Sequence, residues 1–336
     1  MGGGGGSGNL FRTYKGGGYS NAGFSSGLSF SNKSKKSNLS AENIFEAHIE
    51  KIRVSKDEGL HLDDLKNEIS ESLSRDMKVK KVNVIGSTAK NTQIKNKRGN
   101  DIDIMVELDE QEHGDWLKQE NGSRNSLEMF KRTLQKDPKF RNVEMHIDRN
   151  VVTVEVGNLK ADVIPSFPTG DGGHLIPDTS GEKKFIKTNP RLSSRLFKNL
   201  DRKNDNKLSE LTMVVKEWNK RNGDHLTSHH IECMTYDYFL KNKPKDGENS
   251  HKVNIREFFE RIPWNLKRHV KDPVYGERAD IYLNEGKKKR VIANSQKSTK
   301  ILRKAENRAR KGDEMESSKL YREFLGEGEG DNELKE

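Results

Sequence analysis

Apolar positions near the start of the folded part of the chain repeat at steps of three and four residues. This spacing places them on one face of a helix, first over residues 44–52 and again over 62–73. Ser40 stands where its side chain can cap the first helix. The apolar residues of the first helix are Ile44, Phe45, Ile49 and Ile52. Those of the second are Leu62, Leu65, Ile69 and Leu73.

The apolar pattern changes to alternation after residue 80, which is typical of β-strands with one buried face. A short buried strand and three alternating segments follow one another, and residues 161–167 end this strand-rich stretch. The residues that define these strands are Val82, Val84 and Ile85; Ile102, Ile104 and Val106; Val143, Met145 and Ile147; Val152, Val154 and Val156; and Ala161–Phe167.

From Pro190 onward the pattern is helical again. One apolar stripe lies at i, i+3, i+4 and i+7. It consists of Leu211, Val214, Val215 and Trp218. Residues 298–312 and 316–325 predict two late helices, and we expect Trp218 and Trp264 in the core. The architecture predicted is a mixed α/β lobe followed by a helical lobe.

The two ends of the chain differ from this folded part. Residues 1–39 are rich in Gly, Ser and Asn and hold too few apolar side chains to offset chain entropy, so they predict a flexible basic tail. Residues 327–336 contain five acids and one lysine and predict an acidic tail. Between them we expect the α/β lobe over 40–188 and the helical lobe over 189–326.

Composition narrows the class of protein. Of the 336 residues, 30% are hydrophobic and 34% are charged, and there is no apolar run long enough to span a membrane. The N-terminus lacks the apolar segment of a secretory signal. One cysteine, Cys233, excludes an intramolecular disulfide. These features predict a cytoplasmic protein without a membrane partner.

The net charge of +10 favours a polyanionic partner, either a nucleotide or a nucleic acid. Half of this excess lies in residues 1–39, which hold five basic residues and no acid. The alternative is an ordinary basic surface. Residues 287–290, Lys-Lys-Lys-Arg, could contact nucleic acid, but an exposed loop beside Gly286 is the interpretation we favour.

Two aspartates carry the first chemical signal. Asp101 and Asp103 stand two positions apart on a predicted strand, so they project from the same face while Ile102 and Ile104 enter the core. Neighbouring carboxylates repel each other unless they share a cation. A hard divalent ion such as Mg²⁺ prefers oxygen ligands and suits this pair.

Two further segments extend the pattern. Gly86 lets the backbone approach a phosphate closely, and Ser87 offers a hydroxyl and an N–H. A helix that begins there would add a favourable dipole. Asp162 would complete a two-metal site if it lay on a neighbouring strand. Each piece alone is common, whereas the ordered combination is specific.

This combination resembles the signature of the DNA polymerase beta nucleotidyltransferase superfamily. Residues 211–219 and 226–232 are similar to helical-lobe motifs of oligoadenylate synthases and of the bacterial cyclic GMP-AMP synthase-like enzymes, the CD-NTases. Residues 321–326 resemble the aromatic-Gly ending of many bacterial members. The resemblance covers roughly residues 60–326. It implies an α+β fold, with a polymerase-beta-like nucleotidyltransferase lobe and a helical lobe.

The resemblance also implies the metal ligands. Asp101 and Asp103 would bind two Mg²⁺ ions, for which Mn²⁺ is an expected substitute. Asp162 would bind the catalytic ion and help to deprotonate the acceptor hydroxyl.

Five residues would bind the nucleotide by the same resemblance. Gly86 and Ser87 would hold the donor triphosphate, and Lys216 and Ser228 would grip its outer phosphates. Lys216 follows a complete apolar stripe, so we expect its ammonium group to face the cleft freely. His229 stands where relatives often have an aromatic residue that stacks on a base.

The function implied is synthesis of a cyclic or linear oligonucleotide second messenger from nucleotide triphosphates, ATP among them, in antiphage defence. A downstream effector would sense the product, and a regulatory partner is a further expectation. One alternative is a template-independent RNA-tailing enzyme, such as a tRNA CCA-adding nucleotidyltransferase. Another is a catalytically dead binding module, which three intact acids oppose.

The spacing of His225, His229 and Cys233 leaves a different kind of site open. They stand at i, i+4 and i+8, on one face of a helix, and could bind zinc. The sequence shows no fourth ligand nearby. A nucleotide-binding role for His229 and a buried role for Cys233 are therefore favoured.

Overall fold

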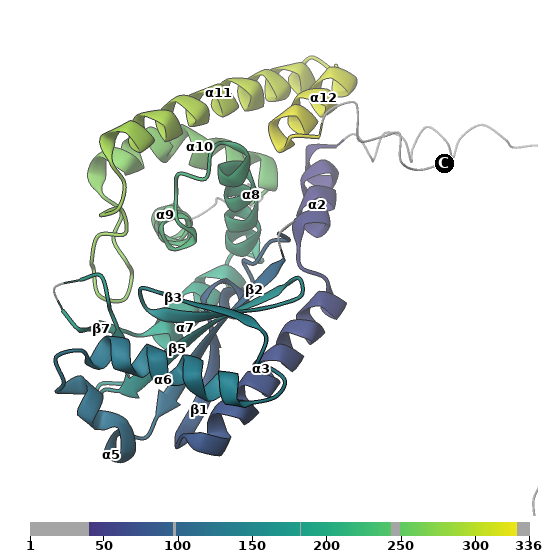
Figure 1. Cartoon of the computed structure of the whole chain (residues 1–336). Coiled ribbons are helices and arrows are strands. Elements are labelled where there is room, and N and C mark those ends of the chain that lie inside the picture. Colours follow the sequence, from purple (N-terminus) through teal and green to yellow (C-terminus); the bar gives the residue numbers. More distant parts are fainter. Residues whose placement is uncertain (1–39, 97–98, 182, 243–248, 328–336) are drawn as a thin grey trace, which may run out of the picture. The chain divides into compact units, whose positions relative to one another are not determined.

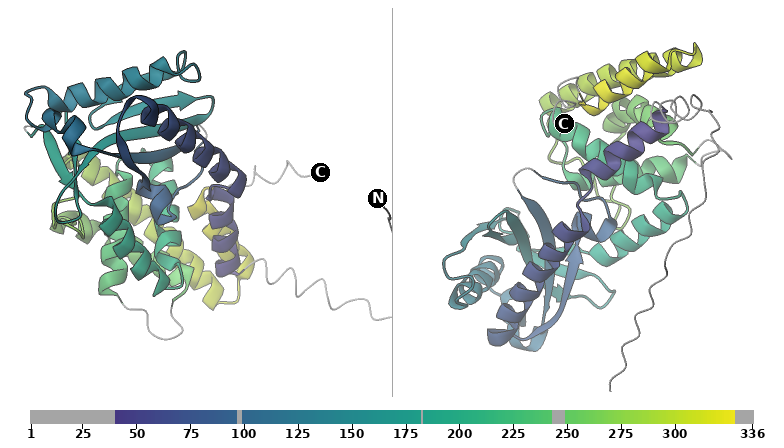
Figure 2. Two further views of the ribbon diagram at one scale, coloured as in Figure 1. Left: turned by 90° about the horizontal axis from the view of Figure 1, so that it is seen from below. Right: turned by 90° about the vertical axis from the view of Figure 1, so that its right-hand side faces the viewer.

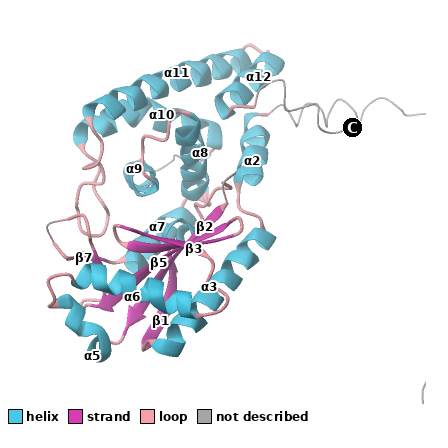
Figure 3. Cartoon of the chain, in the orientation of Figure 1, coloured by secondary structure: helices cyan, strands magenta, loops and turns pink. Residues whose placement is uncertain are grey.

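The computed structural model describes residues 40–96, 99–181, 183–242 and 249–327. The predicted tail over 1–39 and most of the predicted acidic tail lie outside these ranges. The described residues belong to one compact unit. Figure 3 shows the strands gathered in one part of this unit, while the rest is helical.

A mixed sheet organises the first part. Its strands run in the order β1-β2-β5-β4-β3, and β6 joins β5 to β7. The pairing of β2 with β5 is parallel, and the other pairings are antiparallel. The strands are β1 (Val79–Ile85), β2 (Asn100–Leu108), β3 (Glu144–Asp148), β4 (Val151–Val156), β5 (Leu159–Pro168), β6 (His174–Pro177) and β7 (Phe185–Thr188).

Helices α3 and α6 pack on this sheet and bury its apolar residues (Figures 1 and 2). The capping box of Ser55 and Glu58 fixes the start of α3. The helices and turns of this part are α3 (Lys56–Asp76), α4 (Gly86–Lys90), α5 (Glu110–His113), the 3₁₀ turn η1 (Gly114–Leu117) and α6 (Gly122–Lys136).

A second core lies among the remaining helices. Its aromatic residues meet edge to face, as Trp218 and Phe259 do at 5.0 Å between ring centroids. The helices are α2 (Ala41–Ile52), α7 (Pro190–Arg202), α8 (Lys207–Arg221), α9 (Ser228–Lys241), α10 (His251–Arg268), α11 (Glu285–Arg310) and α12 (Glu314–Leu325).

Helix α2 belongs to the helical core, although the predicted boundary placed it in the α/β lobe. The apolar face of α2 packs on α8, α10 and α12, within the helical core, although its residues fall inside the predicted 40–188 lobe. Its predicted cap is confirmed, since the Ser40 hydroxyl accepts a hydrogen bond from the Asn43 N–H. The helix pattern alone cannot say which of two cores its apolar face joins.

Two other expectations were wrong. Residues 287–290 lie in the first two turns of α11, not in a loop, because Asn284 caps the helix by accepting from the Lys287 N–H. Trp264 is 46% exposed, and the Arg268 guanidinium lies 4.2 Å from its ring centroid. Trp218 is buried as predicted, and its Nε1–H donates to Ser298 Oγ.

The late helix predicted over 298–312 begins much earlier, because α11 starts at Glu285, and β6 and β7 continue the strand-rich stretch beyond residue 167. The other predicted helices and strands are confirmed in position. None of the helices in the described ranges combines the length and apolar character that a bilayer crossing requires.

Candidate active site

Three carboxylates meet where β2 and β5 run side by side. Asp103 on β2 stands directly opposite Asp162 on β5, and Asp101 precedes Asp103 by two positions. Ile102 and Ile104 between and after them are buried at 1% and 0% exposure. The alternation of the strand therefore turns all three acids toward one face, as a site for a cation requires.

The electrostatics of these acids are unfavourable without a positive charge. Burial raises the pKa of Asp103 to about 7, and the charges of Asp162 and Asp101 add to this rise. Burial also raises the pKa of Asp101. The positive charge of Lys160 opposes this rise, and the negative charge of Asp162 adds to it. Three oxygen donors that repel one another match the donor set of Mg²⁺. The residues therefore fit a divalent cation.

Two neighbours hold Asp162 in place. The Thr153 hydroxyl donates to Asp162 Oδ1 at 2.7 Å, and Lys160 Nζ lies 3.4 Å from Asp162 Oδ2. Sequence reasoning missed both residues. Lys160 could have been found, because it stands two positions before Asp162 and shares its strand face. Thr153 could not have been found from the sequence, because only the register of β4 places it opposite Asp162.

Gly86 follows the last residue of β1 and begins the five-residue helix α4. Its φ of +65° lies in the left-handed region, and a Cβ at this position would overlap Asp103 Oδ2. The glycine is thus required by contact with a carboxylate of the acidic site. Ser87, the next residue, lines the adjoining pocket.

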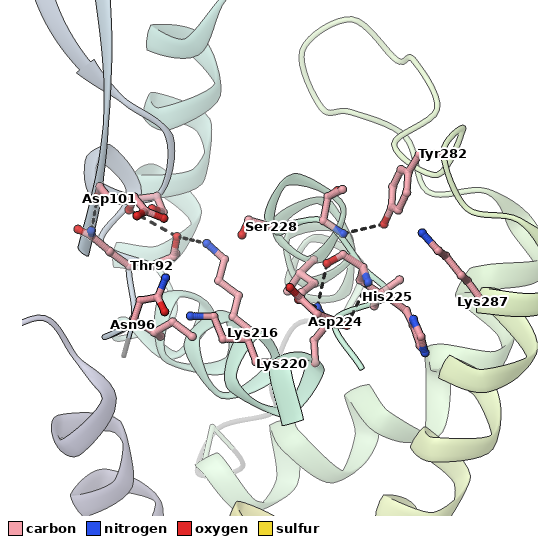
Figure 4. A pocket seen from close by; sticks show the side chains of 17 residues that line it. Thr92, Asn96, Asp101, Lys216, Lys220, Asp224, His225, Ser228, Tyr282 and Lys287 are labelled. Carbon is pink, nitrogen blue, oxygen red and sulfur yellow. Dashed lines mark hydrogen bonds between the residues drawn. The ribbon is translucent and has the colours of Figure 1, made fainter. Parts of the chain in front are cut away.

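That pocket is a cavity of about 420 Å³ between β2, α4 and the helices α8 and α9 (Figure 4). Asp101 lines it at one end, and Ser228 opens α9 beside it. Lys216, Lys220 and Lys287 add three cations to its walls. The N-terminus of the 14-residue helix α9 favours a phosphate there, so the pocket suits a polyanion.

Lys216 does not face this pocket freely, which corrects the expectation from its helix pattern. It is 5% exposed, and its Nζ donates to Glu232 Oε1 at 2.7 Å and to Thr92 Oγ1 at 3.0 Å. Lys90 Nζ donates to the other carboxylate oxygen of Glu232, also at 2.7 Å. The ammonium group therefore sits in a fixed, buried network.

Glu232 is the centre of that network. Burial by itself would raise the pKa of Glu232, but the charges of Lys216 and Lys90 hold it below its usual range. Sequence reasoning assigned Glu232 no role. The available signal was its place at i+4 from Ser228 on α9, which puts both residues on one helix face.

His229 does not line the pocket. Its Nε2 lies 3.6 Å from Asp272 Oδ2 and 3.6 Å from Cys233 Sγ, in a separate cluster. His225 and Tyr282 line the pocket instead. The alternative zinc trio of His225, His229 and Cys233, which the sequence left open but did not favour, is not brought together, because α9 begins only at Ser228 and His225 precedes it.

Comparison with known proteins finds similarity to nucleotide synthetases and synthases. Residues 39–201 match the family model of the Second Messenger Oligonucleotide or Dinucleotide Synthetase domain. A probable cyclic nucleotide synthase of Bacillus cereus (strain VD146) is 28% identical over 188 residues. This match covers 53% of the chain and 55% of the relative, so the chain aligns with about half the length of that protein.

Two solved structures share the fold over most of the chain. The E. coli MS115-1 CdnC structure with ATP has a TM-score of 0.67 at 16% identity and covers 86% of this chain and 98% of its own. The Vibrio cholerae DncV cyclic AMP-GMP synthase, in complex with the linear intermediate 5′ pppA(3′,5′)pG, has a TM-score of 0.58 at 14% identity. It covers 86% of this chain and 82% of its own.

Proposed function

Because this chain belongs to the DNA polymerase beta-type nucleotidyltransferase superfamily and is most like the bacterial CD-NTases, we propose that it makes a cyclic or linear oligonucleotide from nucleotide triphosphates. The observation that carries this proposal is the acidic site of Asp101, Asp103 and Asp162 at the edge of a cationic pocket. A phosphate-rich substrate that reacts at a metal site needs both features together.

The acidic site would hold two Mg²⁺ ions, with Mn²⁺ as a substitute. Bound there, the ions would supply positive charge that stabilises the attacking and leaving oxygens. Asp101 and Asp103 would supply ligands from one strand, and Asp162 would supply the third from the next. The Thr153 hydroxyl keeps Asp162 oriented toward the site, where its carboxylate helps to accept the proton of the attacking hydroxyl.

The reaction proposed is phosphoryl transfer. The oxygen of a ribose hydroxyl attacks the α-phosphorus of a triphosphate, a new P–O bond forms, and the bond to the bridging oxygen breaks as pyrophosphate leaves. Ser87 and Ser228 line the pocket and would bind the triphosphate, and Lys216 would support the outer phosphates from its network with Glu232 and Thr92. Lys220 and Lys287 face the same cavity and add charge for a second nucleotide or for the leaving group.

The biological setting follows from the same resemblance. ATP is the first donor to test, since the CdnC structure contains it. The product would act as a second messenger in cytoplasmic antiphage defence. A separate effector would sense the product, and a regulatory partner would control the synthase.

Incubation with labelled nucleotide triphosphates and Mg²⁺, followed by mass spectrometry, tests the proposal. We expect short oligonucleotides with no RNA present. The double variant Asp101→Asn/Asp103→Asn should lose turnover by at least about 10³-fold while keeping its fold, because this chemistry depends on charge neutralisation by metals. Its thermal midpoint should stay level or rise, since two repelling charges are removed. Turnover close to that of the unmodified chain would place the active site elsewhere.

A further inference from the structure

A second cluster of ligand-type side chains lies outside the nucleotide pocket. His229 and Cys233 stand one turn apart on α9, and Asp272 joins them from the segment after α10. One ligand atom from each lies within 4.8 Å of the others.

The distances fit a particular geometry. Ligand atoms around a tetrahedral Zn²⁺ lie roughly 3.3–3.6 Å apart when the bonds to the metal are about 2.0–2.3 Å. His229 Nε2 lies 3.6 Å from Cys233 Sγ and 3.6 Å from Asp272 Oδ2. The imidazole therefore already stands at ligand spacing from both partners.

Asp272 is oriented for this contact. Its Oδ1 accepts hydrogen bonds from the backbone N–H groups of Val274 and Tyr275, at 2.8 and 2.9 Å. These bonds fix the carboxylate in its turn and leave Oδ2 directed at His229. Ordered support of a ligand in this way is typical of metal sites, where outer partners set the orientation of the coordinating atom.

The surroundings leave room for a fourth ligand. Cys233 is buried, whereas the His229 side chain is 52% exposed, so the cluster opens to solvent on one side. A cavity of about 10 Å³ beside His229 and Cys233 is about large enough for one water molecule. Lys90 also lines this cavity, but its ammonium group is paired with Glu232 at 2.7 Å.

We propose that His229, Cys233 and Asp272 bind one Zn²⁺ ion, with water as the fourth ligand. A nitrogen, a sulfur and a carboxylate oxygen together favour Zn²⁺ over Mg²⁺, which takes oxygen ligands. Binding releases the thiol proton to solvent, and the thiolate forms the Zn–S bond. This site does not depend on the proposed synthase activity.

The ion would join α9 to the segment that leads toward α11. That segment carries Tyr282, whose hydroxyl accepts from the Thr227 N–H at the start of α9. Zinc would thus add a further link between α9 and a wall of the nucleotide pocket, where His230 Nδ1 also lies 2.9 Å from the Tyr282 hydroxyl. We expect it to stabilise the folded chain, because a ligand that binds only the folded state shifts the folding equilibrium toward it.

Titration of the metal-stripped full chain with ZnCl₂, in competition with a chromophoric chelator, tests the proposal. We expect one tight site per chain and a higher thermal midpoint. Replacing zinc with Co²⁺ should give the near-ultraviolet absorption of a cobalt–thiolate bond. The Asp101→Asn/Asp103→Asn variant should retain this site, which separates zinc binding from the acidic site.

Two variants and one control assign the ligands. Cys233→Ser and Asp272→Asn should each weaken zinc binding at least about tenfold, since loss of even an outer partner of a metal ligand costs that much. Asparagine keeps an oxygen for the two backbone N–H groups, so Asp272→Asn tests the ligand without removing the turn. His146→Gln, at an exposed position on β3, should change nothing. Absence of a cobalt–thiolate band, or equal zinc affinity in the unmodified chain and Asp272→Asn, would overturn the proposal.

Discussion

Gly86 illustrates how a single residue connects backbone geometry to the acidic site. Its positive φ alone would favour glycine, and its contact with Asp103 adds a second requirement. Many turn glycines meet only the first requirement. Gly157, in the turn between β4 and β5, has φ of +60° and no atom within 4 Å of where its Cβ would stand. The two glycines therefore differ in what a methyl group would touch.

This difference gives a matched prediction. Gly86→Ala and Gly157→Ala should both lower the free energy of unfolding, by about 1–2 kcal/mol, because each residue would adopt a left-handed conformation. Only Gly86→Ala should also lower turnover strongly, since its methyl group displaces the Asp103 carboxylate. Chemical denaturation and product formation measure the two effects. Equal turnover in the two variants would show that glycine at position 86 is required only by the backbone conformation of the turn, and not by contact with Asp103.

At the scale of elements, a buried ion pair and a buried hydrogen bond join segments that are distant in sequence. Lys90 of α4 reaches Glu232 of α9 across 142 positions, and Lys216 of α8 reaches Thr92 across 124. The helix that carries Ser87 is thereby held against α8 and α9. The spacing between the two sides of the nucleotide pocket depends on this network.

Replacing Glu232 by Gln should therefore affect both stability and substrate binding. It leaves two buried ammonium groups without their carboxylate, which should cost about 3–5 kcal/mol in unfolding free energy. Nucleotide KM should rise because Lys216 loses its fixed position. Asp76→Asn, which removes an exposed partner of Lys136, should cost less than about 1 kcal/mol. An unchanged KM in a folded Glu232→Gln variant would exclude the positioning role.

A second network joins α2, α8 and α10. The buried imidazole of His251 lies between Glu42, 2.9 Å from its Nδ1, and Glu210, 2.8 Å from its Nε2. Burial alone would lower the pKa of His251, but its hydrogen bonds to Glu210 and Glu42 raise it overall. Lys207, 3.1 Å from Nε2, faces the same ring and opposes this rise.

The sign of the resulting pH dependence follows. A histidine whose pKa is higher in the folded state stabilises it fully below the unfolded pKa of about 6.5. This contribution is lost as the pH rises through the folded pKa. Unfolding free energies measured from about pH 6 to about pH 9 should therefore fall for the unmodified chain, and His251→Gln should flatten that part of the curve. An identical slope in both proteins would assign the pH dependence to other groups.

At the scale of the whole molecule, charge separates the proposed synthase from an RNA-tailing enzyme. The net charge is +10, and half of it lies in residues 1–39, outside the described part. Tight RNA binding depends on many phosphate contacts and weakens steeply with salt. The rest of the chain has only a modest excess of positive charge with which to contact RNA phosphates.

We therefore expect product formation from triphosphates alone and weak RNA binding that falls steeply with salt. Fluorescence anisotropy with a labelled tRNA across a salt series measures the binding, and mass spectrometry measures the product in the same buffers. Added tRNA should not increase product. Nucleotide addition to the tRNA 3′ end, without free oligonucleotide, would favour the tailing enzyme.

The sequence by itself determined the features that depend on short-range spacing. Alternation on β2 fixed the common face of Asp101 and Asp103, and the order of motifs predicted an α+β fold with a helical lobe. The start of α2 at Ser40 was equally predictable, because capping depends on residues three positions apart.

Only the tertiary structure decided features that depend on contacts between distant segments. The spacing of apolar residues on α8 predicted a free Lys216 ammonium group. In the structure, Glu232 and Thr92 hold this group in a buried network. Likewise, the chain order does not indicate that Asp272 turns back to His229, or that α2 joins the helical core. A helix pattern identifies the face that is buried, but the partner of that face is set by packing across the whole chain.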